Sequence, residues 1–145
     1  MKESIDLEAL FSKILGERID DFIMPPPSFT ALDSKIIEFD EKEKRICVSM
    51  SIPNFTLNPY GTMQGGMIDA AIDNAVGPLS MLVAPPNMTR TIETKLIKAI
   101  TMKIEYIYVQ AMLVEEKKRR LTFNVSVEDD KGVVYATSKV VNFII

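Results

Sequence analysis

The segment from Gly66 to Leu82 carries apolar residues on nearly every side when it is drawn as a helix. A helix on a protein surface keeps one polar face, whereas a helix that is apolar all round has to be buried all round. Other elements must therefore enclose this one, which leaves few folds open to the chain. We expect the Gly77-Pro78 pair to kink or interrupt the helix, because proline has no backbone N–H to donate.

Strand patterns precede and follow this helix. In Arg120–Glu128, apolar residues alternate with polar ones, which predicts a strand with one buried face. Asp129–Gly132 then has the composition of a hairpin turn. The expected strands are Ser28–Phe39, Arg45–Ile52, Thr89–Ala99, Met102–Val114, Arg120–Glu128 and Val133–Ile144. This order predicts an α+β fold in which an antiparallel β-sheet wraps around a central helix.

The N-terminal segment, about residues 1–24, is expected to be helical. Apolar residues recur at helical spacing over Ser4–Leu15, which predicts an amphipathic helix that stops at Gly16. A short second turn is expected over Glu17–Ile23, before Pro25-Pro26-Pro27 breaks the pattern. No linker divides the chain, so we expect a single domain over residues 1–145.

Charge and composition argue against several classes of protein. The formal net charge is −3, whereas nucleic-acid-binding proteins are usually basic. The most apolar run, from Ala75 to Pro86, is too short and too rich in proline to cross a membrane. The first residues are acidic and lack the apolar core of a signal peptide, so we expect a cytoplasmic protein. The single cysteine, Cys47, falls in a strand pattern and is interpreted as a small buried residue.

The sequence contains no histidine. This removes Ser-His-Asp and Cys-His nucleophilic sites, histidine general bases and metal sites built on histidine. Any catalysis must use carboxylates, amides, hydroxyls and backbone dipoles. We expect neither a metal nor a cofactor.

The junction between a loop and the buried helix is the strongest candidate for a functional site. Gly65 and Gly66 stand at the helix start, where unpaired backbone N–H groups and the helix dipole could hold an oxyanion. The two glycines could instead simply form a tight turn. About two turns further on, Asp73 lies among apolar residues. It is either a catalyst or a structural carboxylate bonded across a subunit contact.

This stretch resembles the motif of the hotdog-fold acyl-CoA thioesterases of the PaaI-like (phenylacetyl-CoA) type. The residues that match the family pattern at its spacings are Asn58, Gly61, Gly65, Gly66 and Asp73. Gln64 departs from the pattern, since the family has a histidine there. The order of the expected elements is also similar, from about Ser28 to the end. The resemblance implies the hotdog fold.

The resemblance also implies an activity, the hydrolysis of a small or medium acyl-CoA, aliphatic or aryl, with coenzyme A as part of the substrate. Asp73 would be the general base or the nucleophile, and the Gly65 N–H would polarise the thioester carbonyl. Asn58 and Thr91 would orient water or substrate, and Gln64 would hold the carbonyl side through its amide. Asn58 could instead only start a turn, and Thr91 could be an ordinary strand threonine.

Further residues are expected to contact the substrate. Gly66 would allow close approach to the helix, and Asp69 lies one turn before Asp73 on the same stripe. Arg119 or Arg120 could meet the CoA phosphates, although the charged run around them could also be a solvated hairpin. The family builds its site between two subunits, which implies a homodimer, with two dimers forming a tetramer.

A different class of function stays open. The chain could be a non-catalytic hotdog module that binds an acyl-CoA or a protein partner. Gln64 favours this alternative, because it replaces the histidine of the family. Asp73 opposes it, because a binding module has no need of the carboxylate.

Overall fold

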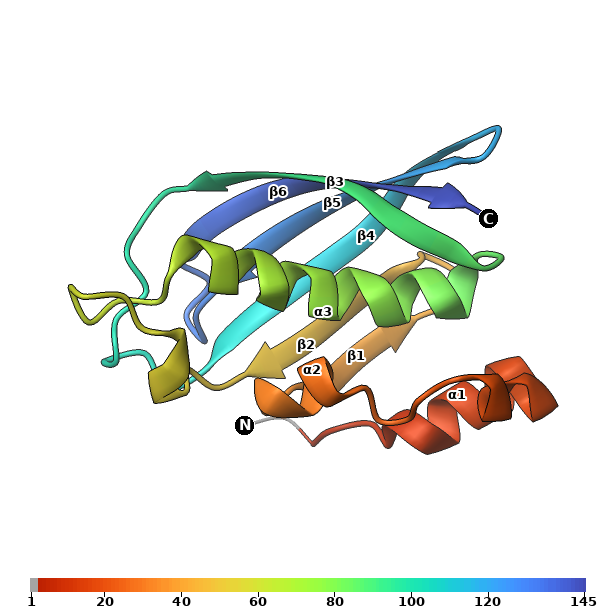
Figure 1. The fold of residues 1–145 in the computed structure, drawn as a ribbon, viewed down its shortest axis with the longest axis horizontal. Helices are drawn as coiled ribbons and strands as arrows, with labels where there is room; N and C mark the ends of the chain where they lie inside the picture. Colours follow the sequence, from red (N-terminus) through yellow and green to blue (C-terminus); the bar gives the residue numbers. More distant parts are fainter. Residues whose placement is uncertain (1–2) are drawn as a thin grey trace.

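A computed structural model describes residues 3–145. A six-stranded antiparallel sheet in the order β1-β2-β4-β5-β6-β3 lies against the long helix α3 (Gly65–Val83), as Figure 1 shows. The strands are β1 (Lys35–Asp40), β2 (Arg45–Met50), β3 (Asn87–Leu96), β4 (Ile107–Lys117), β5 (Arg120–Glu128) and β6 (Val134–Ile144). The expected sheet around a central helix is therefore confirmed. No helix within residues 3–145 is both long and apolar enough to span a membrane.

The core forms between α3 and the concave face of the sheet. Ala71, Ile72, Ala75, Val76 and Leu79 of α3 are fully buried against it. Pro78 does not interrupt the helix, which continues to Val83. Proline removes only one backbone hydrogen bond, and the packing of buried residues on both sides of Pro78 holds the two halves of α3 in line.

The N-terminal helices lie beyond the β1 edge of the sheet (Figure 1). Helix α1 (Leu7–Leu15) is capped by Asp6, whose carboxylate accepts a hydrogen bond from the Ala9 N–H at 2.9 Å. A 3-10 helix, η1 (Gly16–Asp21), follows it. The strand expected from Ser28 is wrong over its first half, because Pro27–Ala31 forms the short helix α2. Proline favours the first position of a helix, since its fixed φ is already helical.

Two other expected boundaries shift. The strand expected from Met102 begins only at Ile107, because the residues before it form a turn in which the Ile104 N–H bonds to the Thr101 carbonyl. Strand β3 begins two residues earlier than expected, at Asn87. It also contains a bulge between Thr89 and Thr91, where its register with β6 shifts. Cys47 is buried on β2, as expected.

The hairpin turn between β5 and β6 is closed by one carboxylate. Asp129 accepts hydrogen bonds from the Lys131 and Val133 N–H groups, both at 2.9 Å, and from the Tyr135 hydroxyl at 3.1 Å. These bonds, the one from Val133 first among them, lower the pKa of Asp129 below its ordinary value.

Asp129→Ala should therefore lower the free energy of unfolding at neutral pH. A carboxylate whose pKa falls on folding stabilises the folded state above the pKa of the unfolded chain, and this contribution is lost as the pH falls through the folded-state pKa. The difference between wild type and variant should shrink in acid, as measured by urea unfolding at several pH values. Asp130→Ala, in the same turn, is the matched control. A difference that stays constant into strong acid would contradict this role of Asp129.

Candidate active site

Asp73 lies halfway along α3 and faces β3. Its Oδ1 atom accepts a hydrogen bond of 2.9 Å from the hydroxyl of Thr89, and both residues are half-buried. Within residues 3–145, no hydrogen bond reaches the second oxygen, Oδ2. A neutral hydroxyl thus orients the carboxylate and leaves one oxygen to act on water or a ligand.

Asp69 lies one turn earlier on the same stripe of α3, as expected. Thr94 donates to its Oδ1 at 2.5 Å, and the Thr94 hydroxyl also lies 3.0 Å from that of Ser138. Ser138 is buried and donates in turn to the Glu93 carbonyl at 3.1 Å. These hydroxyls tie α3 to β3 and β6, so the bond observed at Asp69 holds the helix on the sheet.

Thr91, which the resemblance suggested as a residue that orients water or substrate, is exposed, and within residues 3–145 the hydroxyl bonded to Asp73 is that of Thr89. The bulge in β3 explains this placement. A strand points alternate side chains to opposite faces, and the extra residue at Arg90 reverses that alternation. Thr89 therefore faces α3, and Thr91 faces away. The structure shows Thr89 as the hydroxyl neighbour of Asp73, a residue that sequence reasoning missed.

A buried amide next to Thr89 was also missed. Asn142 on β6 pairs with Thr89 in the sheet register and is only 2% exposed. Its Nδ2 donates to Asn87 Oδ1 at 2.7 Å, and its own Oδ1 has no partner within the described part of the chain. The signal in the sequence was a polar residue at an inward position of β6, where Ala136 and Val140 are apolar.

The start of α3 has the features of an anion site. Gln64 is the N-cap residue, and its carbonyl accepts from the N–H groups of Met67 and Ile68 at 2.9 and 3.0 Å. The N–H groups of Gly65 and Gly66 have no partner among residues 3–145, as the first turn of a helix requires. The Gln64 side chain is exposed and makes no capping bond. It is thus free to turn toward a ligand at these N–H groups.

Asn58 is engaged within its own loop. Its Oδ1 accepts from the N–H groups of Tyr60 at 3.0 Å and Thr62 at 3.1 Å. Its Nδ2 donates to the Thr62 hydroxyl at 2.9 Å. The side chain shapes the loop that leads to Gly65, which is the turn interpretation offered by the sequence.

Gly65 and Asp73 do not meet in one chain. At a rise of about 1.5 Å per residue, they lie about 12 Å apart along α3. Reacting groups have to approach within about 3.5 Å of one another. A site that uses both residues therefore needs two copies of the chain, with Gly65 from one and Asp73 from the other.

Arg119 and Arg120 lie at the β4–β5 hairpin. The guanidinium of Arg119 donates to the Ile144 carbonyl at 2.8 and 3.2 Å, and Arg120 pairs with Glu115 at 3.1 Å. Both arginines border a groove of about 530 Å³. The fold places the two arginines in the same groove, and Asp73 does not line this groove.

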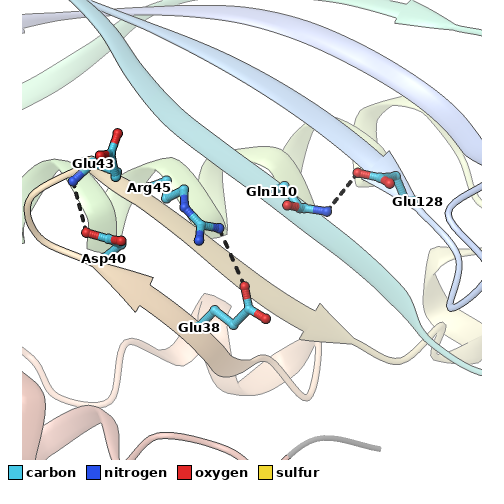
Figure 2. A network of polar contacts seen from close by, with 6 residues as sticks. All are labelled: Glu38, Asp40, Glu43, Arg45, Gln110 and Glu128. Carbon is cyan, nitrogen blue, oxygen red and sulfur yellow. Dashed lines mark hydrogen bonds and ion pairs between the residues drawn. The ribbon is translucent and has the colours of Figure 1, made fainter.

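The face of the sheet away from α3 carries a larger hollow of about 870 Å³. Five carboxylates line it: Glu38, Glu105, Glu128, Asp129 and Asp130. Figure 2 shows two of them held in place, Glu38 by Arg45 at 3.5 Å and Glu128 by Gln110 at 2.9 Å. Burial, and after it the charge of Asp130, raises the pKa of Tyr108 on the same wall. A polyanion such as CoA would be repelled here, and none of the candidate site residues lies in this hollow.

Comparison with known proteins identifies the fold. No protein-family model and no curated protein matches the chain. Among solved structures, the PaaI protein of the E. coli phenylacetic acid degradation operon has a TM-score of 0.77 at 13% identity, over 97% of this chain and 96% of that one. A variant of PaaI from Thermus thermophilus has a TM-score of 0.72 at 19% identity, over 83% of this chain and 100% of that one.

A hypothetical thioesterase from Streptococcus pneumoniae TIGR4, solved with coenzyme A, has a TM-score of 0.73 at 16% identity, over 81% of this chain and 90% of that one. Identities this low establish the fold alone. The chain therefore has the hotdog fold of the PaaI-like thioesterase structures. Two further structures of the pneumococcal protein carry alanine in place of an aspartate and of a threonine.

Proposed function

We propose that the protein is an acyl-CoA thioesterase that hydrolyses a small or medium acyl-CoA. The observation that carries the proposal is the carboxylate of Asp73 held by Thr89 on a hotdog scaffold. In the hypothetical thioesterase from Streptococcus pneumoniae, the substituted aspartate and threonine are separated by 16 positions, as Asp73 and Thr89 are. That protein was also solved with coenzyme A, which supports the choice of substrate.

The proposed reaction uses two copies of the chain. The thioester carbonyl of the substrate accepts a hydrogen bond from the Gly65 N–H of one copy, and the helix dipole stabilises the oxyanion that forms. Asp73 of the other copy takes a proton from water through Oδ2, and the hydroxide adds to the carbonyl carbon. The carbon–sulfur bond then breaks, and the proton passes to the CoA thiolate. Direct attack by Asp73, through a mixed anhydride that water then cleaves, is the variant of this scheme.

The remaining residues take supporting roles in this scheme. Thr89 orients Asp73, in place of Thr91. Asn58 acts by shaping the loop before Gly65, because its side chain is already engaged there. Gly66 lets the substrate approach the helix closely. The scheme requires a homodimer, and two dimers would form a tetramer.

One observation favours the alternative of a non-catalytic binding module. Within the described part of the chain, the Gln64 side chain makes no capping hydrogen bond that would hold it over the Gly65 N–H. A broad panel of acyl-CoAs, followed by release of free thiol, decides between the two functions. Hydrolysis of one or more members would support the enzyme. Binding of acyl-CoA without hydrolysis would support the module.

Gln64→Ala should lower the turnover number by roughly tenfold to a thousandfold, because it removes an amide that can donate to the developing oxyanion. Gln64→His should retain or raise the rate. The wild-type rate should show no titration from position 64, since an amide carries no proton near neutral pH. A native protein that hydrolyses nothing and gains activity only as Gln64→His would favour the binding module.

A further inference from the structure

We infer that Asn142, on the last strand of the sheet, holds the water molecule that Asp73 activates, by accepting a hydrogen bond from it at the amide oxygen. The inference rests on the proposed function, because it concerns the same reaction. It gives the water a second acceptor. Asp73 would take the proton, and Asn142 would fix the direction from which the oxygen attacks.

The orientation of the Asn142 amide is set by a chain of hydrogen bonds that begins near the end of α3. Asn87 donates from Nδ2 to the Pro85 carbonyl at 2.8 Å and to the Ser80 carbonyl at 3.4 Å. A carbonyl can only accept, so the Asn87 amide must present its nitrogen there. Its oxygen then accepts from Asn142 Nδ2 at 2.7 Å. The remaining heavy atom of the Asn142 amide is therefore the oxygen, a pure acceptor.

This oxygen is buried and has no donor among residues 3–145. Burying an acceptor without a hydrogen bond costs folding free energy, so such atoms are usually bonded to an internal water or a ligand. Leucine has a similar volume and would carry no such cost. The amide oxygen thus indicates a place where the fold meets a small donor from outside the chain.

Asn142 stands beside the pair formed by Asp73 and Thr89. Thr89 and Asn142 are register partners on adjacent antiparallel strands, and such partners point to the same face with Cβ atoms about 4.5–5.5 Å apart. The Asn142 nitrogen is directed toward Asn87, which contacts the Ser80 end of α3. Because nitrogen and oxygen occupy the two branches of a planar amide, we expect the oxygen on the opposite side, toward Asp73.

Two acceptors that lack a donor within the described residues therefore lie in one stretch between α3 and β3. They are Asn142 Oδ1 and Asp73 Oδ2. A water molecule has two O–H groups, and it satisfies both acceptors while the lone pairs of its oxygen are left to attack. Gly77, one turn after Asp73 on the same stripe, leaves room: apart from its chain neighbours and the backbone of its own helix, an added Cβ would meet no atom within 4 Å.

The two acceptors have different fates in the reaction. The carboxylate is a base and takes the proton of one O–H group, whereas an amide oxygen carries no proton near neutral pH and keeps its hydrogen bond to the other. The water oxygen forms its new bond to the thioester carbonyl carbon. The carbon–sulfur bond then breaks, and the proton passes from Asp73 to the CoA thiolate. Asn142 thus holds the O–H group that remains on the acid product.

Asn142→Leu should lower kcat by about 10- to 100-fold and leave KM unchanged, because a misplaced reactant reacts slowly while the acyl-CoA still binds. Asn74→Leu is the matched control. It makes the same substitution on α3, next to Asp73, and removes an amide hydrogen bond of 2.8 Å to the Ser28 carbonyl. It should lower the melting temperature and keep the wild-type kcat, as steady-state hydrolysis and thermal melts of both variants would show.

A crystal structure of the native protein supplies a measurement that depends neither on activity nor on the folding of a variant. It should show an ordered water within hydrogen-bond distance of both Asn142 Oδ1 and Asp73 Oδ2. That water, seen in a protein that hydrolyses no acyl-CoA, would support the Asn142 site and reject the proposed function.

Three results would overturn the role of Asn142 in a protein that is active. The first is a crystal structure without this water. The second is an unchanged kcat in Asn142→Leu, or a loss that Asn74→Leu reproduces. The third is a preference for a hydroxyacyl-CoA over the acyl-CoA of the same chain length that Asn142→Leu abolishes, since the amide oxygen would then contact the acyl group and not the water.

Discussion

Asp73→Asn should lower the turnover number by about two to four orders of magnitude, because an amide can neither take a proton from water nor attack a thioester. The substitution keeps the size of the side chain and can still accept the Thr89 hydrogen bond at its oxygen. The fold and the affinity for acyl-CoA should therefore change little. Steady-state hydrolysis, together with a thermal melt of the same sample, measures both.

Thr89→Val gives a matched comparison, since it removes only the hydroxyl that orients the carboxylate. Its loss of turnover should be smaller than that of Asp73→Asn, because the base itself is still present. Thr91→Val should behave as the wild type. Near-normal turnover in a well-folded Asp73→Asn protein would rule out the catalytic role.

Gly65→Pro should lower the turnover number by about 100- to 1000-fold, because it deletes the backbone N–H that would bind the oxyanion. The backbone is suited to proline here. Gly65 is the first residue of α3, and Gln64 before it has φ −63° and ψ 142°, the region that a residue preceding proline prefers. The helix should form normally, as circular dichroism would check.

Gly65→Ala is the control for this substitution. An added Cβ would lie 3.3 Å from the Leu96 Cδ1 atom, the movable end of a side chain, so the crowding is shared by both variants. Only the proline lacks the N–H, and the alanine variant should stay close to wild-type turnover. Equal losses in the two variants would assign the effect to crowding and not to the donor.

The two inactive variants also test whether the site is shared between copies. A mixed dimer of Asp73→Asn with Gly65→Pro would hold one intact site, formed by Gly65 of the first chain and Asp73 of the second. Random exchange of subunits should restore about a quarter of wild-type activity. A mixture that stays inactive after subunit exchange has been verified would contradict the shared site.

The sequence predicted the architecture well, because the spacing of apolar residues along a helix or strand indicates which of its faces is buried. The all-apolar helix could only be central, and the alternation in Arg120–Glu128 gave that strand its observed bounds. Proline was harder to interpret. Pro27 begins a helix where a strand was expected, and Pro78 lies inside a helix that it was expected to break. In both cases the outcome depends on neighbouring packing, which a local pattern does not contain.

The sequence singled out Asp73 as the leading candidate residue but did not show what surrounds it. In the structure Asp73 faces β3 and is bonded to Thr89, because a bulge changed which side chains point inward. Bulges leave no reliable mark in a sequence. Asn58 was selected as a candidate by its spacing, but its bonds to the surrounding loop appear only in three dimensions.

The open edge of strand β3 would make the proposed activity depend on the protein concentration. Its ten residues are bonded to β6 on one side only, and an open edge of this length tends to find another strand. If a second copy covers that edge, folding and association are coupled, and the melting temperature rises with protein concentration. Dilution would then part Asp73 from the Gly65 that completes its site. Activity per molecule would fall at enzyme levels where the copies separate, although every chain stays folded.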